Sequence, residues 1–162
     1  MKKSDNKVVN LFEESKKGIQ KTVITETMKM KRGGSLSNPV LAYETWGKLS
    51  KSKDNVVVIL TGLSASSHVA SSSSDSNPGW WEGIVGPDKA IDTNKFYIIC
   101  VNSLGSCFGS TGPASINQIT GEPFRLTFPE LTIDDMATAT KFLLDKLGIC
   151  LLYTSPSPRD AS

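Results

Sequence analysis

One segment of the sequence, Gly105-Ser106-Cys107-Phe108-Gly109, has the glycine spacing of a nucleophile elbow with a cysteine at its centre. A cysteine attacks acyl carbonyls when a sharp turn places it between a strand and the amino terminus of a helix, where its thiolate is stabilised. Residues 102–113 hold three glycines and a proline, and no helical pattern begins before Thr132. The context of an elbow is therefore missing, and we predict that Cys107 lies in a structural loop.

A second segment, Thr61 to His68, follows directly after an apolar run. A small residue such as Gly62 at the carboxyl end of a parallel strand lets the next backbone amides turn toward the crevice where ligands bind. Such an amide can form part of an oxyanion hole, which stabilises the negative charge on an attacked acyl carbonyl. The same residues also fit an ordinary turn, so this segment alone does not establish a site.

His68 is the only histidine of the sequence. Where a nucleophile elbow is used, the catalytic histidine follows the nucleophile and the acid in chain order. We therefore predict that His68 makes local hydrogen bonds in its loop and is not a general base.

The cysteines of the sequence are Cys100, Cys107 and Cys150, and none forms a Cys-x-x-Cys pair. Because His68 is not spaced for zinc either, we expect no metal site. The first 18 residues contain no apolar run of signal-peptide length and include acidic residues that a transit peptide lacks. We expect a cytoplasmic protein with reduced thiols.

The composition is that of a soluble globular protein, with 38% hydrophobic residues, 21% charged residues and a net charge of +2. These values argue against a disordered tail, collagen or a membrane span. Residues 1–53 hold 12 Lys/Arg against 5 Asp/Glu, but no aromatic platform or nucleic-acid module accompanies them. We expect neither a nucleic acid nor a membrane as partner.

Two continuous apolar runs, Val56–Leu60 and Phe96–Val101, are typical of strands covered on both faces. The 35 residues between them can hold a helix, which predicts a mostly parallel sheet with flanking helices and the α/β class. The alternating segments Thr22–Met28 and Pro39–Thr45 flank a turn at Gly33-Gly34. We predict that they pair as an antiparallel edge of the sheet.

Apolar residues at helical spacing predict a helix over Ile133–Leu147. Thr132 can cap its first turn, Asp134 and Asp135 suit the positive end of its dipole, and Gly148 suits its exit. Another strand is expected after Gly148-Ile149.

We do not expect residues 151–162 to form that strand, because they contain Pro156 and Pro158 and little apolar sequence. They are similar to translated sequencing-adapter read-through, and we expect residues 150–162 to be a non-native tail. A native disordered terminus is the alternative. Residues 1–21 sustain no apolar pattern and are expected to be a mobile lead-in, so the folded part is predicted to span residues 22–149.

Residues 65–76 are rich in serine and lie between a buried strand and Pro78-Gly79-Trp80-Trp81-Glu82. This context predicts a long surface loop over the active-site face rather than a linker between domains. Trp80 and Trp81 either anchor this loop to the core or stack on a substrate or on the adenine of a coenzyme, and we favour anchoring.

Several motifs, in this order and at this spacing, resemble the homoserine O-acetyltransferase family: Leu41-Ala42-Tyr43-Glu44-Thr45-Trp46-Gly47, Thr61 to His68, Pro78 to Glu82 with Gly86-Pro87, Asn102 to Cys107, Gly109 to Ser115, and Phe128-Pro129. The similarity extends from about Thr22 to Ile149.

This resemblance implies the N-terminal part of an α/β-hydrolase fold and a two-step acyl transfer. In the family, an elbow serine activated by a His-Asp pair takes an acyl group from acyl-CoA and passes it to the hydroxyl of homoserine or serine. Leu63 falls where the family places its first oxyanion-hole backbone amide. The resemblance further implies a homodimer that acts in methionine or cysteine biosynthesis.

The sequence departs from the family in two respects. It contains no Gly-x-Ser-x-Gly motif, so the serine, aspartate and histidine of the triad are absent and we expect an inactive fragment. Thr61-Gly62-Leu63-Ser64 replaces a His-Ala-Leu-Thr type of sequence, and residues 102–107 look closer to the serine O-succinyltransferase branch. The acyl donor, acetyl-CoA or succinyl-CoA, and the acceptor therefore stay open. An α/β-hydrolase esterase and a non-enzymatic binding module are the alternatives.

Overall fold

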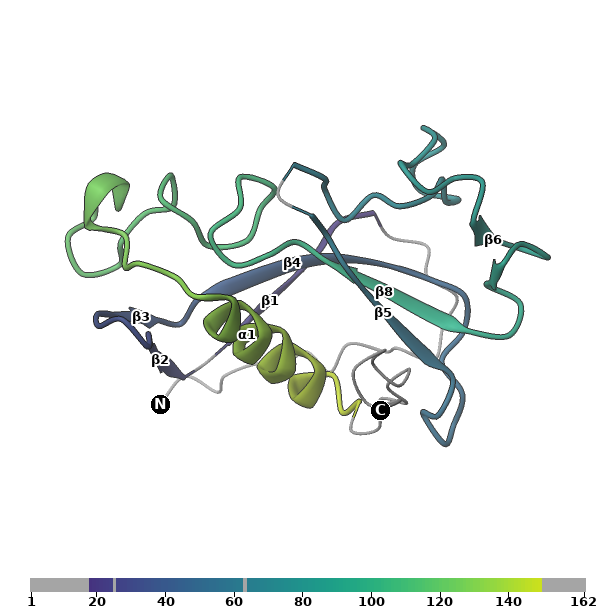
Figure 1. Cartoon of the computed structure of the whole chain (residues 1–162), viewed down its shortest axis with the longest axis horizontal. Coiled ribbons are helices and arrows are strands. Elements are labelled where there is room, and N and C mark those ends of the chain that lie inside the picture. The colour runs from purple at the N-terminus through teal and green to yellow at the C-terminus, as the bar shows by residue number, and fades with distance from the viewer. Residues whose placement is uncertain (1–17, 25, 63, 150–162) are drawn as a thin grey trace, which may run out of the picture.

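The computed structural model describes residues 18–24, 26–62 and 64–149. Their centre is a four-stranded sheet in the order β1-β4-β8-β5 (Figure 1). The strands are β1 (Gln20–Val23), β4 (Val40–Trp46), β8 (Tyr97–Val101) and β5 (Val56–Leu60). β4 runs antiparallel to both β1 and β8, whereas β5 runs parallel to β8.

The smaller elements lie outside this sheet. They are the hairpin strands β2 (Thr27–Lys29) and β3 (Ser35–Ser37), the short parallel pair β6 (Val85–Gly86) and β7 (Ile91–Asp92), the 3-10 turn η1 (Arg125–Thr127) and the helix α1 (Ile133–Lys146). The hairpin turns through Gly33 and Gly34, whose φ angles of 97° and 79° favour glycine.

Helix α1 begins where its capping residues predict. The backbone N–H of Asp135 donates to Thr132 Oγ1 at 3.2 Å, and the backbone N–H of Thr132 donates to Asp135 Oδ2 at 2.8 Å. This reciprocal pair satisfies donors that the first helical turn leaves open. The amide of Lys31 also donates to Asp135 Oδ1 at 3.1 Å, which ties the start of the helix to the β2–β3 turn.

Successive side chains of the central strands point to opposite faces of the sheet, as the pleat requires. On the first face, Tyr97 and Ile99 of β8 pack with Leu143 of α1, and Figure 1 shows α1 lying across this face. On the second face, Ile98 and Cys100 pack with residues that include Trp46, Val69 and Val85. Residues 64–92 therefore cover the second face.

The structure confirms the α/β class and places a strand in each of the two apolar runs. β8 is buried along its length as predicted, but β5 is not covered on both faces, because Val56–Val58 are partly buried and Leu60 is 63% exposed. It also confirms the antiparallel pairing of β1 with β4 and the helix capped by Thr132. The prediction of a helix between the two buried strands is wrong: among the described residues of 61–96 there are only turns and the short strands β6 and β7. The sheet is mixed rather than mostly parallel, because β4 pairs antiparallel with both β1 and β8 and only β5 and β8 are parallel.

Two boundaries differ from prediction. β1 begins at Gln20, inside the predicted lead-in, because Gln20 and Lys21 pair with Tyr43 and Ala42. The expected strand Thr22–Met28 is two strands, since β1 pairs with β4 whereas β2 turns away to pair with β3. Residues 1–17 of the lead-in and the predicted tail 150–162 lie outside the described residues.

Candidate active site

The strands β5 and β8 end side by side, with Leu60 opposite Val101 in the register. We call residues 61–68 the β5 loop and residues 102–112 the β8 loop; Figure 1 shows both leaving the same edge of the sheet. The Thr61 hydroxyl joins them, since it donates to the Val101 carbonyl at 3.3 Å and lies 3.4 Å from Ser103 Oγ. Ligands of parallel α/β sheets bind outside the carboxyl ends of the strands, so this edge is the candidate active site.

Leu63, for which the family resemblance implies an oxyanion-hole amide, lies outside the described residues. Its neighbours Gly62 and Ser64 are exposed. The role of the Leu63 amide stays a prediction.

Glu44 is a buried carboxylate on the second face of the sheet, with only 3% of the residue exposed. Its Oε1 accepts a hydrogen bond from Ser67 Oγ at 3.1 Å, and its Oε2 lies 3.0 Å from His68 Nδ1. A buried carboxylate requires hydrogen-bond donors of this kind, because isolated charge is strongly disfavoured away from water. Glu44 thus joins the central strand β4 to the β5 loop.

Asn102, the first residue after β8, holds the same loop from the other side. Its Oδ1 accepts from the backbone N–H of Ser67 at 2.6 Å. Its Nδ2 donates to Ser67 Oγ at 3.0 Å and to the Phe108 carbonyl at 2.9 Å. The Ser67 hydroxyl therefore accepts from Asn102 and donates to Glu44, and it connects both strands to the loop.

His68 is held at both ring nitrogens. Nε2 lies 2.9 Å from the Asn77 carbonyl, which can only accept, and Nδ1 faces the Glu44 carboxylate. Burial lowers the pKa of His68, but the hydrogen bonds to Glu44 and Asn77 and the negative charges of Glu44 and Asp75 outweigh it, so the pKa is raised overall. The imidazolium form satisfies both contacts. The prediction that His68 makes hydrogen bonds in its loop is confirmed, and neither nitrogen is free to act as a base.

Cys107 is exposed and lies in the β8 loop. No helix follows it before η1 among the described residues, so the predicted absence of an elbow is confirmed. The loop is fixed instead by Ser110, whose hydroxyl donates to the Asn102 carbonyl at 2.7 Å and accepts from the Ala42 amide at 3.0 Å. This arrangement offers no helix terminus that would activate the Cys107 thiol.

The predicted anchoring of Trp80 and Trp81 to the core is not confirmed, because neither side chain belongs to the buried cluster of the second face. Trp80 Nε1 donates to the Ser66 carbonyl of the β5 loop at 2.9 Å, and the rings of Trp80 and Trp81 pack with centroids 4.9 Å apart. Glu82 accepts from the amides of Ser71 at 2.6 Å and Gly79 at 3.0 Å. Trp80 and Trp81 are 40% and 39% exposed, so a large part of each residue faces solvent.

Sequence reasoning missed Glu44 and Asn102 as members of the site. Glu44 does carry a signal, since it is the one charged residue of Val40–Trp46 and shares the face of Ala42 and Trp46. Asn102 directly follows an apolar strand. A polar residue within or just after a buried strand is the pattern that would have marked both.

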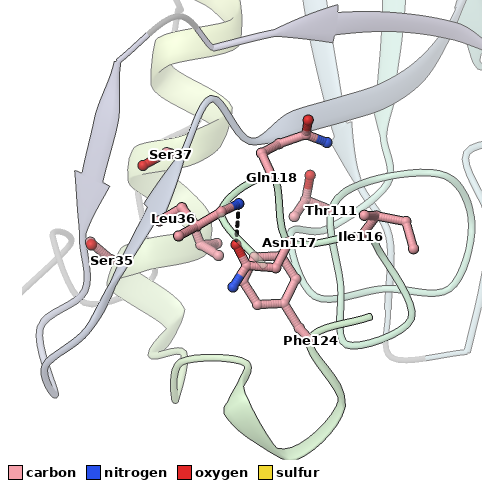
Figure 2. Close-up of a pocket in the computed structure, with 9 residues that line it drawn as sticks. Ser35, Leu36, Ser37, Thr111, Ile116, Asn117, Gln118 and Phe124 are labelled. Carbon is pink, nitrogen blue, oxygen red and sulfur yellow. Dashed lines mark hydrogen bonds between the residues drawn. The ribbon is translucent and has the colours of Figure 1, made fainter. Parts of the chain in front are cut away.

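Two hollows lie elsewhere on the surface. Figure 2 shows one of about 80 Å³ between the β2–β3 hairpin and residues 111–124, where Phe124 forms part of the wall and Asn117 Oδ1 accepts from the Ile119 amide at 2.9 Å. The other, which we call the edge groove, has a volume of about 550 Å³ and lies between β5 and α1, lined by Val58, Leu60, Ala137, Thr140, Leu144 and Ile149 among others. Neither hollow includes Glu44, Ser67, His68 or Asn102.

The part of the chain that the structure describes contains no group of three His, Cys, Asp or Glu residues able to hold a metal ion. None of its helices has the length and apolar character needed to cross a membrane.

Solved structures identify the class of fold. The described residues resemble esterase E22, with a TM-score of 0.73 and 39% identity over 84% of this chain and 39% of that one. They also resemble the homoserine O-acetyltransferase of Bacillus anthracis, with a TM-score of 0.72 and 34% identity over 82% of this chain and 37% of that one. The chain therefore forms part of an α/β-hydrolase fold.

Curated relatives place the chain in a smaller group within the α/β-hydrolase fold. The chain is 60% identical over 124 residues to a serine O-succinyltransferase of Frateuria aurantia, covering 76% of this chain and 34% of the relative. It is 55% identical over 123 residues to an L-serine/homoserine O-acetyltransferase of Streptomyces lavendulae, covering 76% and 33%. No protein-family model matches the chain. The chain is a homologue of the serine and homoserine O-acyltransferases, and it spans about a third of the length of these relatives.

Proposed function

We propose that these residues form part of an O-acyltransferase that moves an acyl group from acyl-CoA to the side-chain hydroxyl of serine or homoserine. The strongest support is the 60% identity over 124 residues to a serine O-succinyltransferase, a region that includes most of the described fold. The two loops that meet at the carboxyl ends of β5 and β8 agree with this proposal, because ligands bind there in open α/β sheets.

In the proposed reaction a serine hydroxyl attacks the thioester carbonyl, the carbon–sulfur bond breaks and CoA leaves as its thiol. The amino-acid hydroxyl then attacks the acyl-enzyme, so that an O-acyl amino acid forms and the enzyme serine regains its proton. Both steps pass through a tetrahedral oxyanion, and the proposed role of the Leu63 amide is to donate a hydrogen bond to it.

The printed sequence contains no Gly-x-Ser-x-Gly motif and only one histidine, which the Glu44 and Asn77 contacts occupy. We therefore propose that the nucleophile and its base are supplied from outside these 162 residues, and that the 162-residue chain alone does not turn over thioesters. Loss of a triad serine alone costs about a million-fold in turnover in a well-studied protease. The proposal includes a cytoplasmic location, as expected from the sequence, and a homodimer, as implied by the resemblance.

A second function has one specific observation in its favour. Among the solved structures named above, esterase E22 has the higher identity, 39% against 34% for the acetyltransferase. In that case water, not an amino-acid hydroxyl, would accept the acyl group from the same acyl-enzyme.

The experiment compares the acceptors directly. The full-length protein that carries these residues is given acetyl-CoA or succinyl-CoA, with and without L-serine or L-homoserine. Thiol release is followed with a chromogenic disulfide, and the product is identified by mass spectrometry. We expect thiol release that depends on the amino acid and yields its O-acyl ester. Release at the same rate without an amino acid would establish the hydrolase instead, and no release with any pair would contradict both.

A further inference from the structure

We propose that Glu44 is a positioning residue of the candidate active site. Its carboxylate, fixed on β4, holds Ser67 and His68, the last two residues of the β5 loop. This inference rests on the proposed function, which assigns the Leu63 amide of the same loop to the oxyanion.

Glu44 stands on a strand that is paired on both sides. β4 is hydrogen-bonded to β1 on one side and to β8 on the other, and Glu44 lies opposite Cys100 in the register with β8. A shift of β4 by one residue would turn Glu44 to the opposite face of the sheet, away from Ser67 and His68. The Glu44 carboxylate therefore has a fixed position relative to the end of β8.

The β5 loop is attached at both ends to this rigid frame. Thr61 donates to the Val101 carbonyl at 3.3 Å, and Ser67 is held by Glu44 at 3.1 Å and by Asn102 at 2.6 Å. The described residues on both sides of Leu63 are thus held to the sheet, and an oxyanion donor needs such a fixed support in order to act without reorganisation.

The charge of Glu44 makes this attachment specific. If the loop moved away, a carboxylate buried in the sheet would lose its hydroxyl and imidazolium partners, which is strongly unfavourable. Such a contact adds little to the overall free energy of unfolding, because burying the carboxylate is itself unfavourable. We therefore expect it to favour one conformation of the loop rather than to stabilise the whole fold. The charged or titratable groups around His68 are Glu44 on β4, Asp75 in its own loop, and Cys100 on β8 beside Glu44.

Because His68 is the only histidine of the chain, its ring signals in NMR report this site alone. In the 162-residue chain, E44Q is expected to weaken proton binding by His68 about tenfold. It should also accelerate exchange of the Ser67 amide hydrogen about tenfold, since that amide is protected only while the loop is seated. The matched variant E82Q removes a carboxylate of the same layer that does not touch His68, and it should leave the His68 titration unchanged. An unaltered titration and exchange in E44Q would overturn the inference.

Catalytic measurements separate positioning from a merely structural role. In the full-length protein, E44Q should lower kcat about 100-fold, the size of effect that a misplacement of about 1 Å produces. The KM for acyl-CoA should change less than about threefold, because the substrate is still bound. The control variant D145N removes an exposed carboxylate of helix α1 that pairs with Lys141, and it should have wild-type kcat. A folded E44Q with wild-type kcat would overturn the inference, whereas an inactive wild type would contradict the proposed function and leave the NMR comparison to decide on Glu44.

Should E44Q fail to fold, S67A provides the test, because it keeps the Glu44–His68 pair and removes only the hydroxyl that joins Glu44 to Asn102. We expect a His68 titration like that of the wild type and a kcat lowered about tenfold with little change in KM. Wild-type kcat in S67A would overturn the inference.

Discussion

Glu44 and His68 lie 24 residues apart in the chain and meet with 3.0 Å between Oε2 and Nδ1, so one contact joins a buried carboxylate on β4 to a partly buried imidazole in the loop after β5. The loop is thereby attached to the sheet through a side-chain contact that depends on charge. This contact has a direct consequence for the pH dependence of folding.

Stability should fall as the pH rises through the folded pKa of His68. The contacts with Glu44 and Asn77 raise this pKa above the unfolded value of 6.5, so the folded chain binds the proton more tightly than the unfolded chain. The contribution of His68 is therefore complete below about pH 6.5 and lost at higher pH. Urea unfolding between about pH 5 and 9 measures it. The difference between wild type and H68Q should shrink with rising pH, and a constant difference would contradict the assignment.

Gly79→Ala should destabilise the layer on the second face by about 3 kcal/mol, because a Cβ there would lie 2.1 Å from the carbonyl carbon of Val69. Backbone atoms cannot move aside as a flexible side chain would. Gly83→Ala is the control, since its Cβ would meet nothing within 4 Å. Thermal unfolding followed by Trp fluorescence should show a clear loss for G79A and almost none for G83A. Equal effects would mean that Gly79 is not closely packed.

Thr132→Ala should cost about 1 kcal/mol, because it removes the side chain that accepts the Asp135 amide at the start of α1. Thr138→Ala is the control on the exposed side of the same helix and should change stability by less than about 0.5 kcal/mol. Far-UV circular dichroism during urea unfolding measures both. A loss in T138A as large as in T132A would show that the capping box is not the source.

Leu60→Lys should reduce self-association of the chain. Among the described residues β5 pairs with β8 alone, Leu60 is 63% exposed, and the apolar edge groove continues from it toward α1. An open strand edge beside apolar surface favours pairing with another copy, which a lysine opposes. Light scattering with size exclusion should show association weakened about tenfold. Leu126→Lys, at an exposed residue of η1, is the control, and equal effects of the two would exclude the β5 edge.

Local patterns predicted most of the elements. The apolar runs at residues 56–60 and 97–101 and the Thr132 cap need only neighbouring residues to be recognised, and all three are confirmed. The covering of the second face was not predictable in this way, because residues 64–92 are fixed by single bonds from distant residues, such as Trp46 Nε1 to the Ala70 carbonyl at 3.2 Å. The spacing of apolar residues along the sequence does not indicate such a bond.

The candidate site shows the same division. The β5 loop was found from the apolar run before Thr61, whereas the contacts of Ser67 with Asn102, 35 residues away, depend on the parallel pairing of β5 with β8. A pairing of strands brings together side chains that no short motif contains. The sequence therefore indicates where the site lies, and the topology determines which residues hold it.

Cys100 lies fully buried next to Glu44, and burial together with that negative charge raises the pKa of its thiol to about 12, while Cys107 is exposed. An alkylating reagent at neutral pH should thus mark Cys107 at once and reach Cys100 only when the layer over the second face detaches. The rate at which Cys100 becomes alkylated, measured from peptide masses, therefore reports how often that layer opens.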